Sequence, residues 1–437
     1  MDSQATNFIT FNRRDFGKKV NQEMATIGVQ YGGTSSPTLT RLTTASAGVG
    51  GSANILSGWN NSLSQAQATA LLNSFSPFML QRCNLSDTGI PLAWCSGSGS
   101  TWGGCGYSDY GINGQVMSVV PAAYQFTDVG TGANAGKIAW WIGNVLGDVI
   151  TTIDGGTHTI SNADIPPAFI VDGVPKQVGF VGSFEGSVSG GKLQSIAGVS
   201  PVDTVTKATY RGYAQARGSG WQLETIQMHG WLGMLIILET ASLNSQGTIG
   251  NGVSYASTIN TGYTATAGTA PSGNVTYGNT TPATANAVSY RGVENLWGNV
   301  SKFIEGIRTD TSNGLWIAPQ TNAIPYSDAS TLTGTQVGAY INTGSTAPTI
   351  SSASYITSIF TTSALSGLFF PSAASGGSST TYFCDIGVVA APANSLVFYF
   401  GGNNGTTAGN PGIFMFSSNT SAISSPSISS RLQYFPQ

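Results

Sequence analysis

The residue types that could support acid–base chemistry are concentrated in one stretch, residues 289–308, which reads SYRGVENLWGNVSKFIEGIR. Residues 311–430, by contrast, contain only two charged residues, both Asp. Within the stretch a Trp is followed directly by Gly and Asn, which tolerate turn geometries that other residues resist, and an Arg and a Glu three residues apart are close enough to pair. This pattern favours a structural hub, with a buried Trp at a tight turn ringed by paired charges, over a catalytic centre. The predicted hub residues are Arg291, Glu294, Trp297 and Asn299.

The sequence offers few of the residues that nucleophilic or metal-dependent catalysis needs. It contains only two His, His158 and His229, so a nucleophile in the carboxyl-terminal half would lack a neighbouring imidazole base. The four Cys form no close pair of the kind that zinc sites use. A calcium ion takes six to eight oxygen ligands, and residues 311–430 offer only Asp328 and Asp385. We therefore expect no enzyme, no metal and no cofactor.

The composition is unusual for a folded chain of 437 residues. Charged residues make up 8%, against roughly 25% in ordinary soluble proteins, and Gly, Ser, Thr and Asn take their place. Hydrophobic residues at 40% argue against disorder, and short apolar runs between Gly-rich segments favour β-structure with long loops. The formal net charge is −3 without a basic stripe, which argues against nucleic acid as a partner.

No targeting pattern stands out either. The longest apolar run, residues 231–238, is too short to span a bilayer, so we expect no membrane insertion. The first residues contain no apolar signal core, so we expect synthesis in the cytoplasm without a signal peptide. In such a chain buried free thiols are favoured, with a disulfide from Cys83 to Cys95 or Cys105 as the alternative. A poorly charged, Ser/Thr-coated and unexported protein fits a virion component.

Apolar periodicity predicts one dominant helix. In residues 222–240 large apolar side chains recur near helical spacing, and the second half is apolar almost all round, which predicts burial. Gly230 and Gly233 predict close backbone packing against a sheet, and His229 is interpreted as a structural residue. Strands are predicted over residues 115–126, 137–145, 178–188, 395–400 and 412–417, and residues 300–307 are predicted as a strand or a short amphipathic segment.

Several short motifs, in order along the chain, resemble one known family. Tyr290-Arg291-Gly292, Glu294-Asn295 and Trp297-Gly298-Asn299 resemble the core motif of C-type-lectin-like domains of the formylglycine-generating-enzyme type. They are most similar to the version in bacteriophage tail and receptor-binding proteins, including variable proteins diversified by retroelements. The similarity continues at Gln81-Arg82-Cys83-Asn84-Leu85, Gly114-Gln115-Val116-Met117, Glu185-Gly186, Gly401-Gly402, Ala408-Gly409, Phe414 and Arg431-Leu432. Arg82 stands where the family has proline.

The resemblance implies an α+β fold, with a C-type-lectin-like carboxyl domain in which a central helix packs on a twisted antiparallel sheet. The predicted organisation is an amino-terminal arm for attachment or oligomerisation over residues 1–35, a β-rich module over 36–163 and the C-type-lectin-like domain over 164–437. Residues 247–288 read as an insertion loop. Formylglycine-generating enzymes carry a close Cys pair near the carboxyl end; residues 385–437 contain no Cys, which also argues against catalysis.

The family's variable region implies that residues 395–432 form ligand-binding hairpin loops. Polar loops displayed on a rigid fold are a usual way to build a recognition surface. The predicted receptor-binding residues are Tyr399, Asn403, Asn404, Thr406, Thr407, Asn410, Ser417 and Asn419.

These observations predict a phage virion protein, on the tail or capsid surface, that binds a host cell-surface receptor, protein or glycan. We expect it to contact other virion proteins and to form a homo-oligomer, most simply a homotrimer as in many phage tail fibres. The alternatives are a capsid or tail decoration or fibre protein without a receptor role, and an unrelated bacterial surface-display binder.

Overall fold

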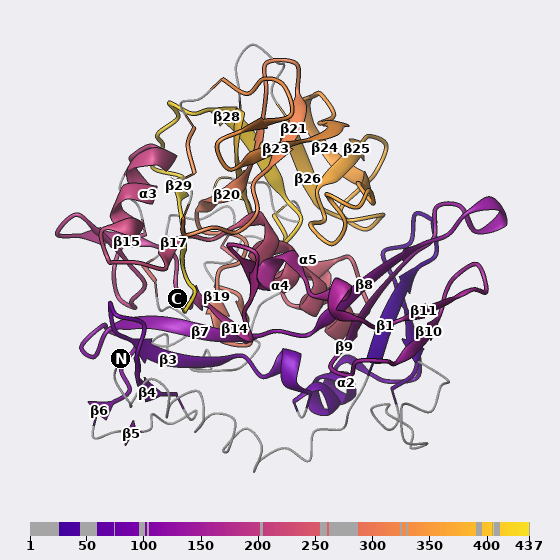
Figure 1. Cartoon of the computed structure of the whole chain (residues 1–437), viewed down its shortest axis with the longest axis horizontal. Coiled ribbons are helices and arrows are strands. Elements are labelled where there is room, and N and C mark those ends of the chain that lie inside the picture. Colours follow the sequence, from indigo (N-terminus) through magenta and orange to yellow (C-terminus); the bar gives the residue numbers. More distant parts are fainter. Residues whose placement is uncertain are drawn as a thin grey trace.

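Figure 1 shows a computed structural model of the chain, which describes residues 26–43, 59–73, 75–95, 101–102, 105–201, 204–253, 260–261, 287–323, 326–328, 331–389, 396–403, 405 and 411–436. This part of the chain is mostly β-sheet with few helices, in agreement with the predicted α+β class at the level of secondary structure. Of the predicted amino-terminal arm, residues 1–25 lie outside the described residues, and most of the predicted insertion loop does so too.

Three sheets make up the architecture of the described residues. The four-stranded sheet has the order β2 (Thr40–Thr43), β1 (Thr26–Tyr31), β9 (Ile138–Gly143), β8 (Tyr124–Val129). The antiparallel six-stranded sheet has the order β17 (Trp221–Leu223), β30 (Leu432–Tyr434), β14 (Val178–Gly182), β7 (Gln115–Pro121), β3 (Gln81–Leu85), β4 (Pro91–Trp94).

The ten-stranded sheet has the order β22 (Gln336–Val337), β23 (Tyr340–Thr346), β21 (Gly314–Ile317), β20 (Ser301–Thr309), β27 (Leu396–Phe400), β28 (Phe416–Thr420), β26 (Ile386–Val389), β24 (Ile350–Ile359), β25 (Pro371–Ala374), with β29 (Ile428–Ser429) paired to β20. Paired two-stranded units are β5 (Thr101–Trp102) with β6 (Cys105–Gly106), β10 (Val149–Thr151) with β11 (Thr157–Thr159), β12 (Ile170–Val171) with β13 (Val174–Pro175), β15 (Ser187–Ser189) with β16 (Lys192–Gln194), and β18 (Ser289–Tyr290) with β19 (Val293–Glu294).

The described α-helices are α2 (Gln65–Leu72), α3 (Lys207–Gln215), α4 (Ile226–Thr240) and α5 (Ser245–Thr248), with short 3-10 turns η1 (Ser76–Phe78), η2 (Gly132–Asn134), η3 (Asn162–Asp164) and η4 (Pro167–Phe169). The predicted helix is confirmed as α4, although it begins later, because residues 221–223 pair as strand β17. The side chain of Thr225 caps it by accepting a hydrogen bond from the Met228 amide at 3.3 Å. Ala241 ends it in the left-handed conformation.

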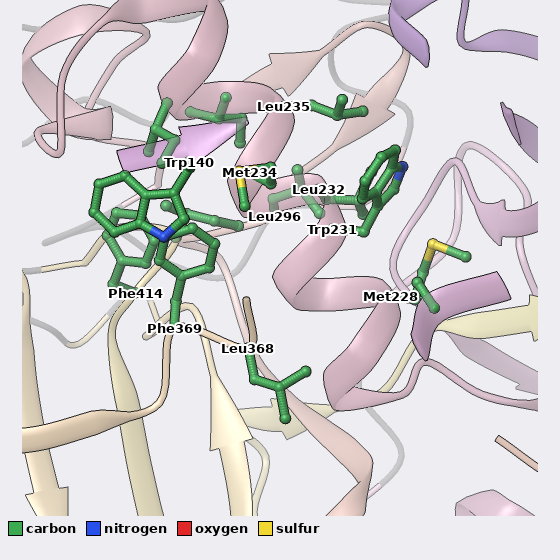
Figure 2. Close-up of a cluster of buried hydrophobic side chains, with 14 of the residues drawn as sticks. Trp140, Met228, Trp231, Leu232, Met234, Leu235, Leu296, Leu368, Phe369 and Phe414 are labelled. Atoms are coloured by element: carbon green, nitrogen blue, oxygen red, sulfur yellow. The ribbon is translucent and has the colours of Figure 1, made fainter. Parts of the chain in front are cut away.

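Every residue of α4 is buried, and Figure 1 shows the helix between the three sheets. Figure 2 shows its side chains in one cluster with Trp140 of β9 and with Phe369 and Phe414. The Phe369 ring lies 5.4 Å from that of Trp140 and 5.2 Å from that of Phe414. A Cβ added at Gly230 would lie 2.6 Å from the carbonyl oxygen of Gly367. The close approach predicted for Gly230 is therefore to the turn before β25, not to a sheet.

The predicted boundary between residues 163 and 164 falls inside a shared architecture. The six-stranded sheet takes β3, β4 and β7 from one side of it and β14, β17 and β30 from the other. One hydrophobic cluster also runs from Ile27 to Phe435. Residues 26–31, assigned to the arm, form β1, which is hydrogen-bonded on both edges. The described residues thus form one packed body rather than an arm and two modules.

The other strand predictions differ in their limits. Residues 115–126 form two strands, β7 and β8, which lie in different sheets and are separated at residues 122–123. The predicted strand over 412–417 lies later, as β28, because residues 412–415 turn so that the Met415 amide donates to the Gly412 carbonyl at 3.1 Å. The strand predicted over 300–307 is β20, and all nine of its residues are buried.

Candidate functional site

The terminal hairpin of β27 and β28 carries the predicted binding residues. The two strands are antiparallel, with Tyr399 opposite Ser417 and Val397 opposite Asn419. After β27 the chain turns at Gly401 and Gly402, whose φ angles are 85° and 64°. A Cβ at Gly401 would also lie 2.5 Å from the carbonyl oxygen of Leu296. Only glycine fits this turn without strain.

Three of the predicted residues share one face of this hairpin. Tyr399, Ser417 and Asn419 are each half-buried, and the Ser417 hydroxyl donates to the Tyr399 hydroxyl oxygen at 3.1 Å. The Tyr399 ring packs edge-on against Phe303 with 6.1 Å between centroids. Ser417 ends the strand predicted over residues 412–417, and Asn419 is predicted in the loop after it; both lie within β28. This face is therefore partly structural, with its polar atoms at the border of the core.

The loop that follows β27 is described only in part. Asn403 is half-buried, and its side-chain oxygen accepts a hydrogen bond from the Gly405 amide at 2.9 Å, which makes a local Asx turn. Asn404, Thr406, Thr407 and Asn410 lie outside the described residues. The second loop, residues 421–427, alternates half-buried with exposed side chains.

A buried carboxylate that the sequence analysis did not select fixes the far end of the first loop. Asp385 accepts from the Phe414 amide at 2.8 Å and from the side-chain amide of Gln246. Its burial is complete and raises its pKa to about 8, partly opposed by these hydrogen bonds. The sequence feature that could have pointed to Asp385 is its rarity, since it is one of only two charged residues between positions 311 and 430.

The four hub residues are all buried: Arg291, Glu294, Trp297 and Asn299. Trp297 has no exposed surface, as predicted, and its indole N–H donates to the Gly250 carbonyl at 2.8 Å. The predicted local pair is replaced by a long-range one, because the Arg291 guanidinium donates from Nε to Glu239 Oε2 at 2.7 Å. Glu239 lies at the end of α4, where it is also held by Tyr290, so this ion pair joins the hub to the central helix.

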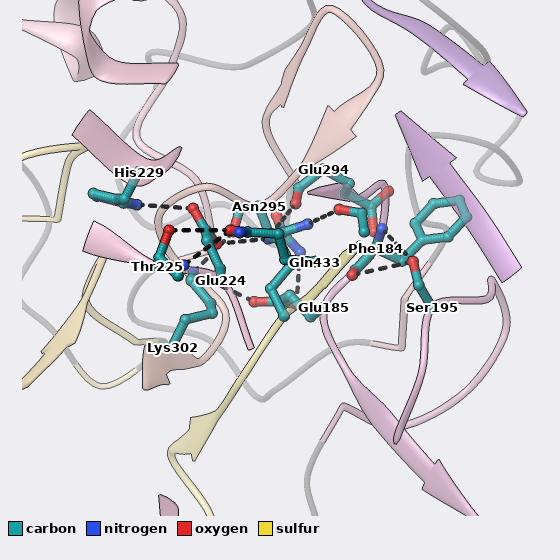
Figure 3. A network of polar contacts seen from close by, with 12 residues as sticks. Phe184, Glu185, Ser195, Glu224, Thr225, His229, Glu294, Asn295, Lys302 and Gln433 are labelled. Carbon is teal, nitrogen blue, oxygen red and sulfur yellow. Dashed lines mark hydrogen bonds and ion pairs between the residues drawn. The ribbon is translucent and has the colours of Figure 1, made fainter. Parts of the chain in front are cut away.

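A second polar network lies behind the Trp297 turn (Figure 3). Glu185 accepts from the side-chain amides of Asn295 at 3.0 Å and Asn299 at 2.5 Å. Lys302 donates to the Asn295 carbonyl at 2.8 Å and lies 3.6 Å from Glu185 Oε1. Arg431 donates to the Glu294 and Gly182 carbonyls at 2.6 and 2.7 Å. Residues 180–200 and 289–302 are thus tied to the terminal strand.

The hub and the hairpin are in direct contact. The Gly298 amide donates to the Gly401 carbonyl at 2.8 Å, and the Gly401 amide donates to the Met415 carbonyl at 2.9 Å. The base of the candidate binding loop therefore rests on the buried Trp297 turn on one side and on Asp385 on the other. Both supports are held by buried hydrogen bonds, from Trp297 to the Gly250 carbonyl and from the Phe414 amide to Asp385.

His229 and the buried Cys residues have structural roles. His229 has both ring nitrogens occupied, Nδ1 by Glu224 at 3.2 Å and Nε2 by the Ile413 carbonyl at 2.9 Å. Burial raises the pKa of the Cys384 thiol to about 12 and that of Cys83 further, so neither forms the thiolate that a nucleophile needs. Cys83, Cys95 and Cys384 are buried free thiols. A small cavity beside His229, Phe400 and Phe414 has room for about one water molecule.

Among the described residues, no group of three or more His, Cys, Asp or Glu is placed to hold a metal ion. Within the same ranges, no helix has the length and apolarity needed to cross a membrane. The chain matches no protein-family model, and a search of curated proteins finds no match.

Proposed function

We propose that this protein is a bacteriophage virion protein that recognises the host cell surface through the loops of its terminal hairpin. We further propose that its fold is of the C-type-lectin-like type. Two features support it: α4 packs between antiparallel strands, and the terminal strand β30 pairs with β14 and β17. The motif residues at 290–299, 185 and 431 also meet in one buried network.

The observation that carries the proposal is the contrast between the base and the tip of the hairpin. The base is fixed by glycine turns, by Asp385 and by the Gly298–Gly401 hydrogen bond. Asn403 of the loop and Ser417 and Asn419 on the adjoining face offer amide and hydroxyl groups that are only partly buried, with the Tyr399 ring beside them. Such groups suit a polar ligand, either a glycan or a polar protein surface.

Direct binding tests this function. Purified full-length protein is added to host cells in increasing amounts, and the adsorption of the parent phage is then measured. We expect saturable binding to the cells and a matching loss of phage adsorption. Saturable binding to the phage particle with none to the cells would overturn the receptor role and favour a decoration or fibre protein.

The same preparation tests the assembly. The low charge of the surface suits contacts between protein copies, because charged residues are depleted from interface cores. We expect light scattering to give the mass of a trimer. A monomer that is still incorporated into particles would contradict this part of the proposal.

A further inference from the structure

Lys302, Glu185 and Asn295 form an arrangement that neither the hub nor the hairpin requires. Glu185 and Asn295 have no exposed surface, and Lys302 is 2% exposed. The Lys302 amine donates to the main-chain carbonyl of Asn295 at 2.8 Å, while the Asn295 side-chain amide donates to Glu185 Oε2 at 3.0 Å. The other carboxylate oxygen, Oε1, lies 3.6 Å from the amine. An amine, an amide and a carboxylate thus meet in a water-excluded site.

We propose that Lys302 and Asn295 form an intramolecular isopeptide bond, with Glu185 as the proton-transfer group. The Nζ lone pair attacks Cγ of Asn295 and forms the Cγ–Nζ bond, and Nζ gives a proton to Glu185. Glu185 returns this proton to Nδ2, the Cγ–Nδ2 bond breaks, and one ammonia leaves. No oxidant, reductant or further reactant takes part.

The lowered pKa of Lys302 suits this reaction. Burial lowers the pKa of Lys302 to about 8, an effect that the Glu185 charge opposes. About a tenth of the amine is therefore neutral at pH 7, and hence nucleophilic, far more than for an ordinary lysine with a pKa of about 10.4. Glu185 faces both nitrogens between which the proton must move, since it accepts from Asn295 Nδ2 at 3.0 Å and its other oxygen lies 3.6 Å from the Lys302 amine. A slight shortening of the second contact brings it within hydrogen-bond reach of both, where one group can act as base and then as acid.

We favour Asn295 over Asn299 as the acyl partner because one of its side-chain atoms has no hydrogen-bond partner. The side-chain oxygen of Asn295 is buried without a hydrogen-bond partner, which is uncommon for a buried polar group. Lys302 also contacts residue 295, at its main-chain carbonyl oxygen 2.8 Å from Nζ, and within the described part of the chain no such contact is made to residue 299. The bond would close a short ring over residues 295–302 and would lock the Trp297–Gly298 turn that supports Gly401.

A second buried lysine, Lys207, serves as a control because we expect it to have only a structural role. Lys207 is also fully buried, but its neighbours are carboxylates, with Glu305 at 3.2 Å and Asp328 at 3.5 Å. A carboxylate held between cations is no acyl donor for an amine. Lys207 should therefore remain unmodified in the same preparation.

The test is the mass of the full-length protein under denaturing conditions, followed by tryptic mapping. We expect a mass below that of the sequence by one ammonia, about 17 Da, no tryptic cleavage after Lys302 and normal cleavage after Lys207. Glu185→Gln and Lys302→Arg should restore the sequence mass. A wild-type mass equal to the sequence overturns the proposal, whether or not the variants fold. So does a loss of ammonia with normal cleavage after Lys302, which would indicate a succinimide.

Discussion

The hub around Trp297 and the terminal hairpin are neighbours, joined by the hydrogen bond from Gly298 to Gly401, yet they are built from different chemistry. The hub and the strand that follows it bury Glu294, Lys302 and Glu305 almost completely. The described hairpin, residues 396–403 and 411–420, has no charged residue, and several of its hydroxyls and amides are only half-buried. Of these two regions, the hub uses buried charges to fix its geometry, and the described hairpin contains only neutral polar groups.

This division has a physical reason. A buried charge is tolerated only when it is paired and hydrogen-bonded, as in the set formed by Lys207, Arg211, Glu305 and Asp328. Such pairs fix position strongly, because loss of one member leaves the other charge uncompensated. Neutral amides and hydroxyls cost less to desolvate, so a surface made of them can exchange water for a ligand with less loss of free energy.

The largest expected effect is at the hub. Trp297→Ala should lower the free energy of unfolding by about 3–5 kcal/mol, because it opens a cavity and removes a hydrogen bond to Gly250. Trp297→Phe is the milder companion variant and should cost less. The measurement is urea unfolding, and a loss under about 1 kcal/mol for the Ala variant would mean that Trp297 does not organise this region.

The ion pair between the hub and α4 should come next. Arg291→Leu leaves Glu239 buried without its guanidinium partner and should cost about 3 kcal/mol. The double variant Arg291→Leu/Glu239→Leu should recover part of this loss, since no buried charge is left alone. A double variant that is as unstable as the sum of the two single variants would show that the pair is not coupled.

The sequence anticipated the hub's burial but not its partners. The Trp297-Gly298-Asn299 turn within a charge-dense stretch was visible as a local pattern, and so was the apolar run of α4. The partner of Arg291 is 52 residues away, and no local spacing encodes such a pairing. The shared six-stranded sheet was missed for the same reason, because β7, β14 and β30 are brought together only by the tertiary fold.

The candidate site was anticipated in outline. Its polar composition and glycine turn were readable from residues 399–411. The half-buried state of Tyr399 and the strand position of Ser417 and Asn419 depend on pairing with Phe303 and β27. The support from Asp385 depends on the approach of Gln246 and Phe414, which come from segments far apart in the sequence.

A pH titration distinguishes the support of the hairpin from its surface. The pKa of Asp385 is raised to about 8 in the folded protein, so the folded state holds its proton more tightly than the unfolded chain. Its contribution to stability is present below the unfolded pKa, near 4, and is lost as the pH rises toward 8. We expect a slope of up to about 1.4 kcal/mol per pH unit for this proton.

Asp385→Asn is the control for the titration, because the amide keeps the shape and cannot titrate. The stability of this variant, measured by urea unfolding from pH 4 to 8, should fall less steeply than that of the wild type. Identical pH profiles for the two proteins would contradict the assignment of the titration to Asp385.

The smallest expected change in stability is at the tip. The triple variant Asn403→Ala/Asn404→Ala/Asn410→Ala should change the free energy of unfolding by no more than about 0.5 kcal/mol, the usual range for surface substitutions. Tyr399 is left intact in this variant, since its ring packs on Phe303. A large loss of stability in the triple variant would show that the loop is part of the core.

Phage adsorption tests the central claim most directly. Particles carrying the triple tip variant are compared with particles carrying Thr331→Ala/Thr333→Ala/Thr335→Ala, a matched change of exposed polar residues next to β22 at the edge of the same sheet. With equal melting temperatures and equal incorporation into particles, we predict that adsorption to host cells falls at least about tenfold for the tip variant, as loss of a few dominant contacts gives, and is unchanged for the edge variant. Equal adsorption of the two kinds of particle would contradict receptor recognition by the terminal hairpin.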